Sequence, residues 1–158
     1  MKKKPINVRE KGATGEREVA KLIKKSLGVS LVRNLEQTRN GGHDLMPEVD
    51  TGCAICQFAI EVKRYNRVTD GKVKTWWEQT TSQADNVDKK PCLIYRGDNE
   101  PWRVMINSEL QPFITIQVTM SFEGFVAYMH VLNYKNADFK PLDLEYQKAI
   151  DVNFWKLL

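Results

Sequence analysis

Two charged residues interrupt an apolar, strand-like stretch of this 158-residue chain, and they constrain what the stretch can form. Residues 54–65 are rich in apolar side chains, which predicts a β-strand. Side chains two apart on a strand share a face, so Glu61 and Lys63 project together while Ile60 and Val62 face the opposite layer. Charges on a buried strand are costly unless they are paired or functional. The pattern therefore predicts a central strand that carries a functional Glu-Lys pair.

The remaining pattern predicts one α/β domain. Apolar residues at helical spacing predict helices over 12–27 and 72–87, with Thr14 as the N-cap of the first and Gly28 at its end. Five further strands are predicted, over residues 29–35, 43–46, 92–95, 102–106 and 114–119, and the third and fourth of these form a hairpin. Residues 122–132 fit either element type, and a short helix is expected over 150–158. This order predicts a single domain with a central mixed β-sheet flanked by helices.

The N-terminal region is strongly basic. Residues 1–33 carry ten Lys and Arg against three Glu, although the whole chain has a net charge of only +4. Such a region suits a polyanionic partner such as nucleic acid, and a solvated helix face with a solubilising tail explains it equally well. We expect residues 1–11 to be a basic flexible tail, 12–107 the core, and 108–158 a C-terminal extension that packs on the core or forms a dimer interface.

Neither a membrane span nor a secretory signal is expected. The apolar runs end well before 18 residues, and no apolar segment follows the basic N-terminus, so the default compartment is the cytoplasm. The three cysteines are an odd number, which argues against a disulfide framework in a reducing compartment. Cys53 and Cys56 have the spacing of a zinc knuckle, with Cys92 and His43 as further ligands. They run into an apolar strand, however, where cysteine commonly packs as a small hydrophobe, and we favour packing.

Two more carboxylates can join the pair on the central strand. Asp44 follows a Gly-Gly turn that lets the chain cross close to that strand, and Glu16 lies on the first helix. Carboxylate oxygens suit Mg²⁺, and a neighbouring lysine can orient water and offset phosphate charge. The hypothesis is metal-assisted phosphodiester hydrolysis: Asp44 and Glu61 bind Mg²⁺, Lys63 handles the attacking water, and Glu16 completes the shell.

A Glu-x-Lys sequence alone carries little information, because it occurs by chance about once in every two chains of this length. The ordered combination is more specific. The stretch from Lys11 to Glu18, the Gly-Gly-His43-Asp44 turn, the Glu61-Val-Lys63 strand and residues 76–104 follow one another along the chain. In this order they resemble the PD-(D/E)xK nuclease superfamily, and in particular archaeal-type and phage Holliday junction resolvases. The resemblance covers about residues 10–107.

This resemblance implies a restriction-endonuclease-like fold and a nuclease core over residues 12–107. It also implies Glu16, Asp44, Glu61 and Lys63 as the active site, Mg²⁺ as cofactor with Mn²⁺ able to substitute, and branched DNA, a four-way junction, as substrate. A homodimer is implied as well, because a junction has two equivalent scissile phosphates and a two-fold dimer presents two equivalent sites. The host would be a bacterial, archaeal or phage-infected cell. Two departures from the family pattern are the extension beyond residue 107 and the long segment between Asp44 and Glu61.

The second predicted helix carries Gln79 and Gln83 on one face, because residues four apart on a helix lie on the same side. We assign Gln83 a catalytic role and Gln79 a DNA-binding role, with a solvated polar face as the alternative. The cations expected to contact phosphates are Lys11, Arg17, Arg64 and Arg96. Arg64 also fits an ion pair at the rim, because it points to the opposite strand face from Lys63.

Two other functions remain open. A duplex nicking or mismatch endonuclease would use the same residues on a different substrate. A non-catalytic DNA-binding module on a nuclease fold would bind DNA without cutting it. The presence of Glu16, Asp44, Glu61 and Lys63 together favours an enzyme over such a module.

Overall fold

A single mixed β-sheet organises the computed structural model, which describes residues 8–34, 42–111 and 114–135. Its six strands lie side by side in sequence order: β1 (Leu31–Arg33), β2 (Leu45–Pro47), β3 (Phe58–Tyr65), β4 (Lys90–Gly97), β5 (Arg103–Gln111) and β6 (Ile114–Ser121). β3 and β4 are parallel, and every other neighbouring pair is antiparallel. The predicted α/β domain with a central mixed sheet, including the β4–β5 hairpin, is confirmed.

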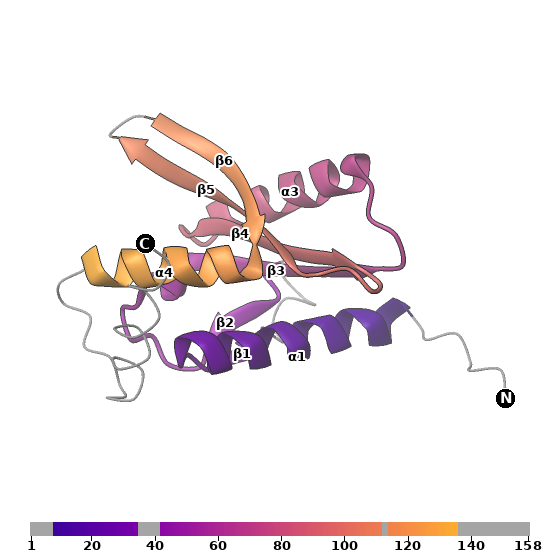
Figure 1. The fold of residues 1–158 in the computed structure, drawn as a ribbon, viewed down its shortest axis with the longest axis horizontal. Coiled ribbons are helices and arrows are strands. Elements are labelled where there is room, and N and C mark those ends of the chain that lie inside the picture. Colours follow the sequence, from indigo (N-terminus) through magenta and orange to yellow (C-terminus); the bar gives the residue numbers. More distant parts are fainter. Residues whose placement is uncertain (1–7, 35–41, 112–113, 136–158) are drawn as a thin grey trace, which may run out of the picture.

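Helices cover both faces of this sheet (Figure 1). α3 (Asp70–Asp85) connects the parallel strands β3 and β4, because parallel strands need a crossover. It packs on one face through Trp76, against Leu93 and Met105. α1 (Val8–Leu27) and α4 (Phe122–Lys135) cover the other face, where a larger core includes Ile60 and Val62. The alternation along β3 therefore places Glu61 and Lys63 on the face that α3 covers, opposite Ile60 and Val62, so the predicted division of β3 into two faces is confirmed.

The first helix begins earlier than expected. α1 starts at Val8, so residues 8–11, expected in the tail, form its first turns. Thr14 is therefore inside the helix and is not its N-cap, and its hydroxyl donates to the Glu10 carbonyl one turn back, at 2.7 Å. Gly28 ends the helix as predicted, with a positive φ of 71° and its N–H bonded to the Lys24 carbonyl at 3.0 Å.

Gly15 allows α1 to lie close to β3. A Cβ atom at this position would come within 3.2 Å of the Arg64 Cβ and 3.5 Å of the Trp102 ring. Any larger residue would push the helix away from the strand. The close approach matters because the next residue along the helix is Glu16.

The chain before β3 does not form the long strand that the sequence predicts. Residues Ala54–Gln57 form a short 3₁₀ turn, η1, and the strand begins at Phe58. The Ala54 N–H donates to the Asn133 side chain of α4 at 2.7 Å, so it is taken away from any sheet ladder. A contact from 79 residues away thus overrides the local apolar pattern.

The described part of the C-terminal extension is built into the fold. The expected boundary at residue 107 falls inside β5, and the next elements are β6 and α4, so residues 122–132 are helical. Phe122, Phe125 and Met129 of α4 are buried in the larger core. The helix predicted over 150–158 lies outside the described residues. None of the helices in the described ranges is sufficiently long and apolar to traverse a lipid bilayer.

Candidate active site

Asp44 is hydrogen-bonded to β3 at the two residues that flank Glu61. Its N–H donates to the Ile60 carbonyl at 2.9 Å, and its Oδ2 accepts the Val62 N–H at 2.7 Å. β2 contacts β3 through the single register pair Leu45↔Ile60, so the chain just before β2 crosses over the strand at this point. The prediction that the turn carries Asp44 close to Glu61 is confirmed by these bonds.

Glu61 is the most deeply buried of the predicted carboxylates, with 1% of its surface exposed. Its Oε1 accepts hydrogen bonds from Lys63 Nζ at 2.6 Å and from Gln79 Nε2 at 3.4 Å. Its Oε2 is buried and has no hydrogen-bond partner among the residues that the structure describes. Burial, and then the negative charge of Asp44, raise the pKa of Glu61 to about 7, against the opposing effect of Lys63. A desolvated carboxylate oxygen of this kind is suited to a cation.

Glu16, on α1, faces Asp44 and Glu61. These three acidic residues together are the carboxylate group of the site. Glu16 is buried, and its charge and that of Asp44 repel each other. Burial raises its pKa, and a hydrogen bond from Arg33 Nε opposes this rise. Arg33 is not among the site residues that the sequence predicts. Nothing in local spacing connects a helix to an edge strand 17 residues away, so this contact arises only from the tertiary fold.

His43 is buried beside Asp44, with 6% of its surface exposed. Within the described part of the chain, neither ring nitrogen has a hydrogen-bond partner. Burial lowers the pKa of the imidazole, and the positive charge of Lys89 lowers it further. At neutral pH the side chain is therefore an uncharged imidazole that borders the carboxylate group.

The two glutamines of α3 occupy different positions. Gln79, assigned to DNA binding, donates to Glu61 and so belongs to the carboxylate group itself. Gln83, assigned a catalytic role, is half-buried one turn further along, and no described residue forms a hydrogen bond with its enclosed Oε1. The structure thus brings Gln79 into contact with Glu61, one of the predicted catalytic residues.

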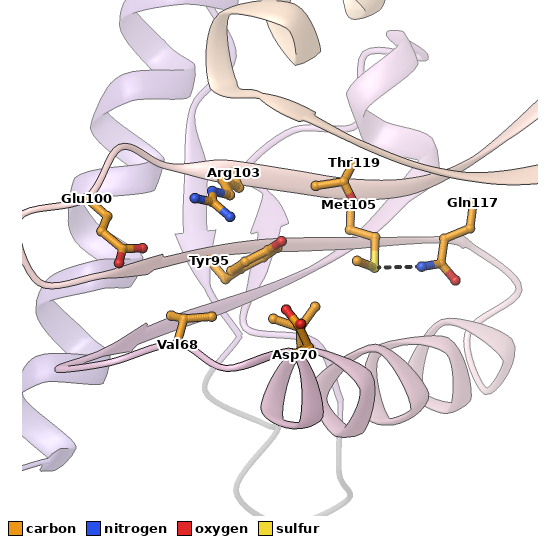
Figure 2. A pocket seen from close by; sticks show the side chains of 9 residues that line it. Val68, Asp70, Tyr95, Glu100, Arg103, Met105, Gln117 and Thr119 are labelled. Atoms are coloured by element: carbon orange, nitrogen blue, oxygen red, sulfur yellow. Dashed lines mark hydrogen bonds between the residues drawn. The ribbon is translucent and has the colours of Figure 1, made fainter.

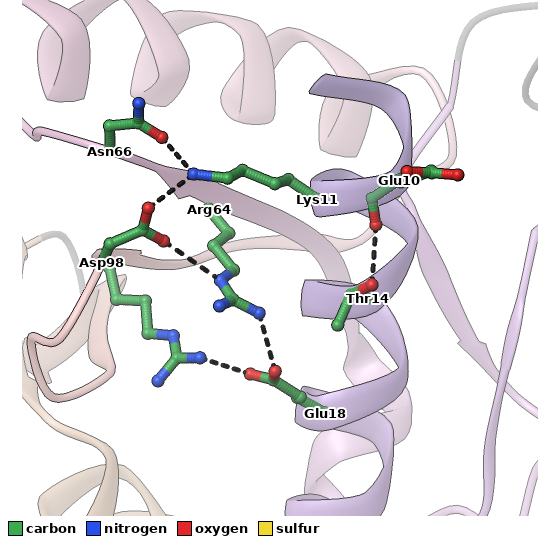
Figure 3. Close-up of polar contacts among 8 residues, drawn as sticks. Glu10, Lys11, Thr14, Glu18, Arg64, Asn66 and Asp98 are labelled. Atoms are coloured by element: carbon green, nitrogen blue, oxygen red, sulfur yellow. Dashed lines mark hydrogen bonds and ion pairs between the residues drawn. The ribbon is translucent and has the colours of Figure 1, made fainter. Parts of the chain in front are cut away.

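Three of the four cations expected to contact DNA belong to an ion-pair network between α1 and the sheet (Figure 3). Arg64 donates to Glu18 at 2.7 Å, and Arg96 donates to the other oxygen of the same carboxylate at 2.6 Å. Lys11 pairs with Asp98, and this contact holds the pKa of that carboxyl below its usual range. Any phosphate that approaches these cations must compete with carboxylates already in place.

Arg17 differs from these three cations. It is exposed, and within the described parts of the chain it takes part in no ion pair. Its positive charge lies close enough to Glu16 to favour ionisation of that carboxyl. Of the predicted phosphate contacts, it is the one whose charge is available at the surface.

Replacing Glu18 with alanine is expected to destabilise the protein by about 1 kcal/mol, because Arg96 loses its carboxylate partner. Arg64 keeps only the longer contact to Asp98, at 3.5 Å, and both guanidinium groups remain partly exposed. For a chain of this size the melting temperature should fall by about 2–4 °C at low salt, and by less at high salt. Glu78→Ala is the matched control, since Glu78 is an exposed helical glutamate outside this network. Equal melting temperatures for the two variants at low salt would contradict the prediction.

A cavity of about 410 Å³ lies on the other side of α3, toward β5 and β6 (Figure 2). Its lining includes Asp70, Glu100 and Arg103 but none of the residues of the carboxylate group. Gln117 donates to the Met105 sulfur across one end of it, at 3.3 Å. With two acids against one base, this cavity does not suit a DNA backbone.

The donor set at the carboxylate group fits a hard divalent cation. Asp44, Glu61 and Glu16 offer oxygen atoms only, and one oxygen of Glu61 has no other partner. Across residues 8–34, 42–111 and 114–135, no three Asp, Glu, His or Cys side chains already converge as a ready-made metal cage. Mg²⁺ commonly binds through one or two carboxylates plus waters and phosphates, so the partial set is compatible with it.

Comparisons with known proteins complete this description. The model of a family described as "Phage putative PDDEXK endonuclease" matches residues 7–146. Protein D14 of Escherichia phage T5 is 24% identical over 117 residues, which cover 65% of this chain and 72% of that protein. Among solved structures, Hjc from Archaeoglobus fulgidus, a Holliday junction resolvase from an archaeal hyperthermophile, aligns with a TM-score of 0.48 and 14% identity, covering 74% of this chain and 96% of that one.

Proposed function

Because this chain belongs to the phage family of PDDEXK endonucleases, we propose that it is a divalent-metal-dependent enzyme that cuts branched DNA, as a Holliday junction resolvase. Family membership establishes the enzyme class, a nuclease. The observation that carries the proposal is the buried Glu61 carboxylate, held by Lys63 and Gln79 beside Asp44. Burying a carboxylate with an unsatisfied oxygen costs stability, and such costs concentrate at functional sites.

Each residue of the group has a distinct role in this proposal. Asp44 and Glu61 would hold Mg²⁺, with Glu16 completing the shell, and Mn²⁺ would substitute. When bound, the ion supplies Lewis acidity toward a phosphoryl oxygen and lowers the pKa of a bound water. Lys63 donates hydrogen bonds to the attacking water and offsets the negative charge that develops on the phosphate. Gln79 and Arg33 keep Glu61 and Glu16 in place.

The choice of a junction as substrate rests on the sequence resemblance and on a dimer. A two-fold dimer would present two equivalent active sites to the two equivalent phosphates of a junction. β6 supports such an assembly, since it is one of the two edge strands of the sheet that the described residues form, and its eight residues carry no charge. Ile114 and Ile116 are exposed there, by 49% and 37%. An uncharged, exposed edge of this length is a template for pairing with another strand.

Ile116→Lys is therefore expected to weaken the dimer at least about tenfold, because pairing two copies along β6 brings the two new charges close together. Light scattering across a micromolar concentration series measures the change. Thr75→Lys, at an exposed position of α3 away from this edge, is the matched control and should leave the dimer intact. A wild-type monomer at micromolar concentration would refute the dimer, and an unaffected Ile116→Lys dimer would refute its placement on β6.

The defining experiment compares a labelled four-way junction with a linear duplex and a single strand of the same arm sequences. Each substrate is incubated with the wild-type protein in Mg²⁺, in Mn²⁺ and in EDTA. Cutting confined to the junction, and lost in EDTA, is the expected result. Equal cutting of the duplex would retain the active site but discard the substrate, in favour of a nicking or mismatch endonuclease. Tight binding without cutting in either metal would favour the non-catalytic DNA-binding module.

A further inference from the structure

Two thiols meet in the connection between β2 and β3. Cys53 Sγ and Cys56 Sγ are 2.9 Å apart, and both side chains are buried. The 3₁₀ turn η1 brings them together, because the Cys56 N–H bonds to the Cys53 carbonyl at 2.9 Å and folds the turn onto itself. The hydrolysis proposed above makes no use of either sulfur.

The two sulfurs have different acidities. The two thiols share a hydrogen bond in which either sulfur can be the donor, and this bond lowers the pKa of Cys53 to about 6 while it raises that of Cys56. Thr51 adds a hydroxyl near the pair, 3.9 Å from Cys56 Sγ. Cys92 is equally buried, but burial alone raises its pKa, and it has no such sulfur partner. The pair therefore combines a thiolate and a thiol, whereas Cys92 is an inert core residue.

We propose that Cys53 and Cys56 are a redox-active dithiol, which small disulfides such as oxidised glutathione convert into an intramolecular disulfide. The Cys53 thiolate attacks the small disulfide, forming a mixed disulfide and releasing one thiolate. Cys56 then loses its proton to that thiolate and attacks the Cys53 sulfur, releasing the second small thiolate, which takes up from water the proton that Cys53 lost when it ionised. In total, two protein thiols and one small disulfide give one protein disulfide and two small thiols. The sulfurs need to approach by less than about 1 Å to reach bonding distance.

The location of the pair gives its oxidation a structural effect. The turn lies in the segment that joins Asp44 to Glu61, and the bond from Ala54 to Asn133 ties it to α4. A disulfide would cross-link this turn and restrict the unfolded chain, although the closed loop is short. The melting temperature of the oxidised protein is expected to rise by about 3–6 °C.

Counting free thiols tests the proposal directly. The full-length protein is incubated in glutathione buffers from fully reduced to fully oxidised, then unfolded, alkylated with iodoacetamide and weighed by mass spectrometry. All three thiols should be alkylated in the reduced sample and only Cys92 in the oxidised one. Because the sulfurs are buried, the series is repeated in about 2 M urea, which speeds local opening. Three alkylated thiols in every buffer, with and without urea, would overturn the proposal.

Variants isolate the pair from its surroundings. Cys92→Ala should still form the disulfide, whereas Cys53→Ser should not, and Cys53→Ala serves the same purpose if the serine variant does not fold. In one alternative outcome, added Zn²⁺ protects the pair from alkylation and oxidised glutathione causes no loss of thiols. That result would assign the pair to metal binding and overturn the redox role. The readout is a thiol count, so its outcome is independent of whether the protein cuts junctions.

Discussion

Glu61→Gln is expected to lower the rate of DNA cleavage by about 10³-fold. The substitution removes the negative charge while keeping the shape of the side chain and the oxygen that accepts from Lys63 and Gln79. The neutral amide neither attracts a divalent cation nor opposes the charge of Lys63. Single-turnover cleavage of a labelled four-way junction in saturating Mg²⁺ measures the loss.

Two controls separate a lost active site from a lost fold. Glu78→Gln changes an exposed glutamate of α3 and should cleave at the wild-type rate. Binding of the junction by Glu61→Gln in Ca²⁺ or EDTA should stay within a few-fold of wild type, since the contacts to the DNA backbone are unchanged. If Glu61→Gln kept more than a tenth of the wild-type rate, Glu61 would have no part in the catalytic machinery.

The same substitution is expected to stabilise the metal-free protein at alkaline pH. Burial raises the pKa of Glu61 from 4.5 to about 7, so the folded state disfavours the charged carboxylate that the unfolded chain accommodates in water. Below pH 4.5 the residue is protonated in both states and imposes no penalty. Between pH 4.5 and 7 the penalty develops, and it reaches about 3 kcal/mol above pH 7. Glutamine never carries this charge, so the variant escapes the penalty.

Thermal unfolding in EDTA at pH 5 and pH 8 measures this effect. Glu61→Gln should melt roughly 6–12 °C above wild type at pH 8, and the gap should shrink to about a quarter of that at pH 5. Mg²⁺ should raise the melting temperature of the wild type more than that of the variant, because the variant has lost one of the three proposed carboxylate ligands. A gap of the same size at both pH values would show that side-chain packing rather than ionisation is responsible.

The parts of the site that sequence reasoning identified are those set by local periodicity. Glu61 and Lys63 share a face of β3 because of the two-residue repeat of a strand, and this needs no knowledge of the rest of the chain. The position of Asp44 followed from a glycine turn, but its bond to the Val62 N–H depends on how β2 meets β3. The contact between Arg33 and Glu16 joins two elements that no local pattern relates.

The errors in the predicted fold also occur where the local sequence pattern does not decide the structure. Thr14 has the chemistry of an N-cap, yet the preceding residues from Val8 continue the helix. Residues 54–57 are apolar enough for a strand, but Asn133, far along the chain, binds their backbone instead. Residues 122–132 were ambiguous because they are apolar on more than one side. Packing of Phe125 and Met129 against the larger core decides in favour of a helix.

Because Asp44 is attached to β3 next to the edge strands, its position relative to Glu61 depends on how firmly β1 and β2 are held to the rest of the sheet. Two backbone groups of β3 hold Asp44, and the ribbon of β1 and β2 joins the sheet through one register pair. Edge ribbons with few attachments open at lower free energies than the strands behind them. Heating should therefore separate Asp44 from Glu61 before the core melts, so that heat inactivation precedes global unfolding and reverses on cooling.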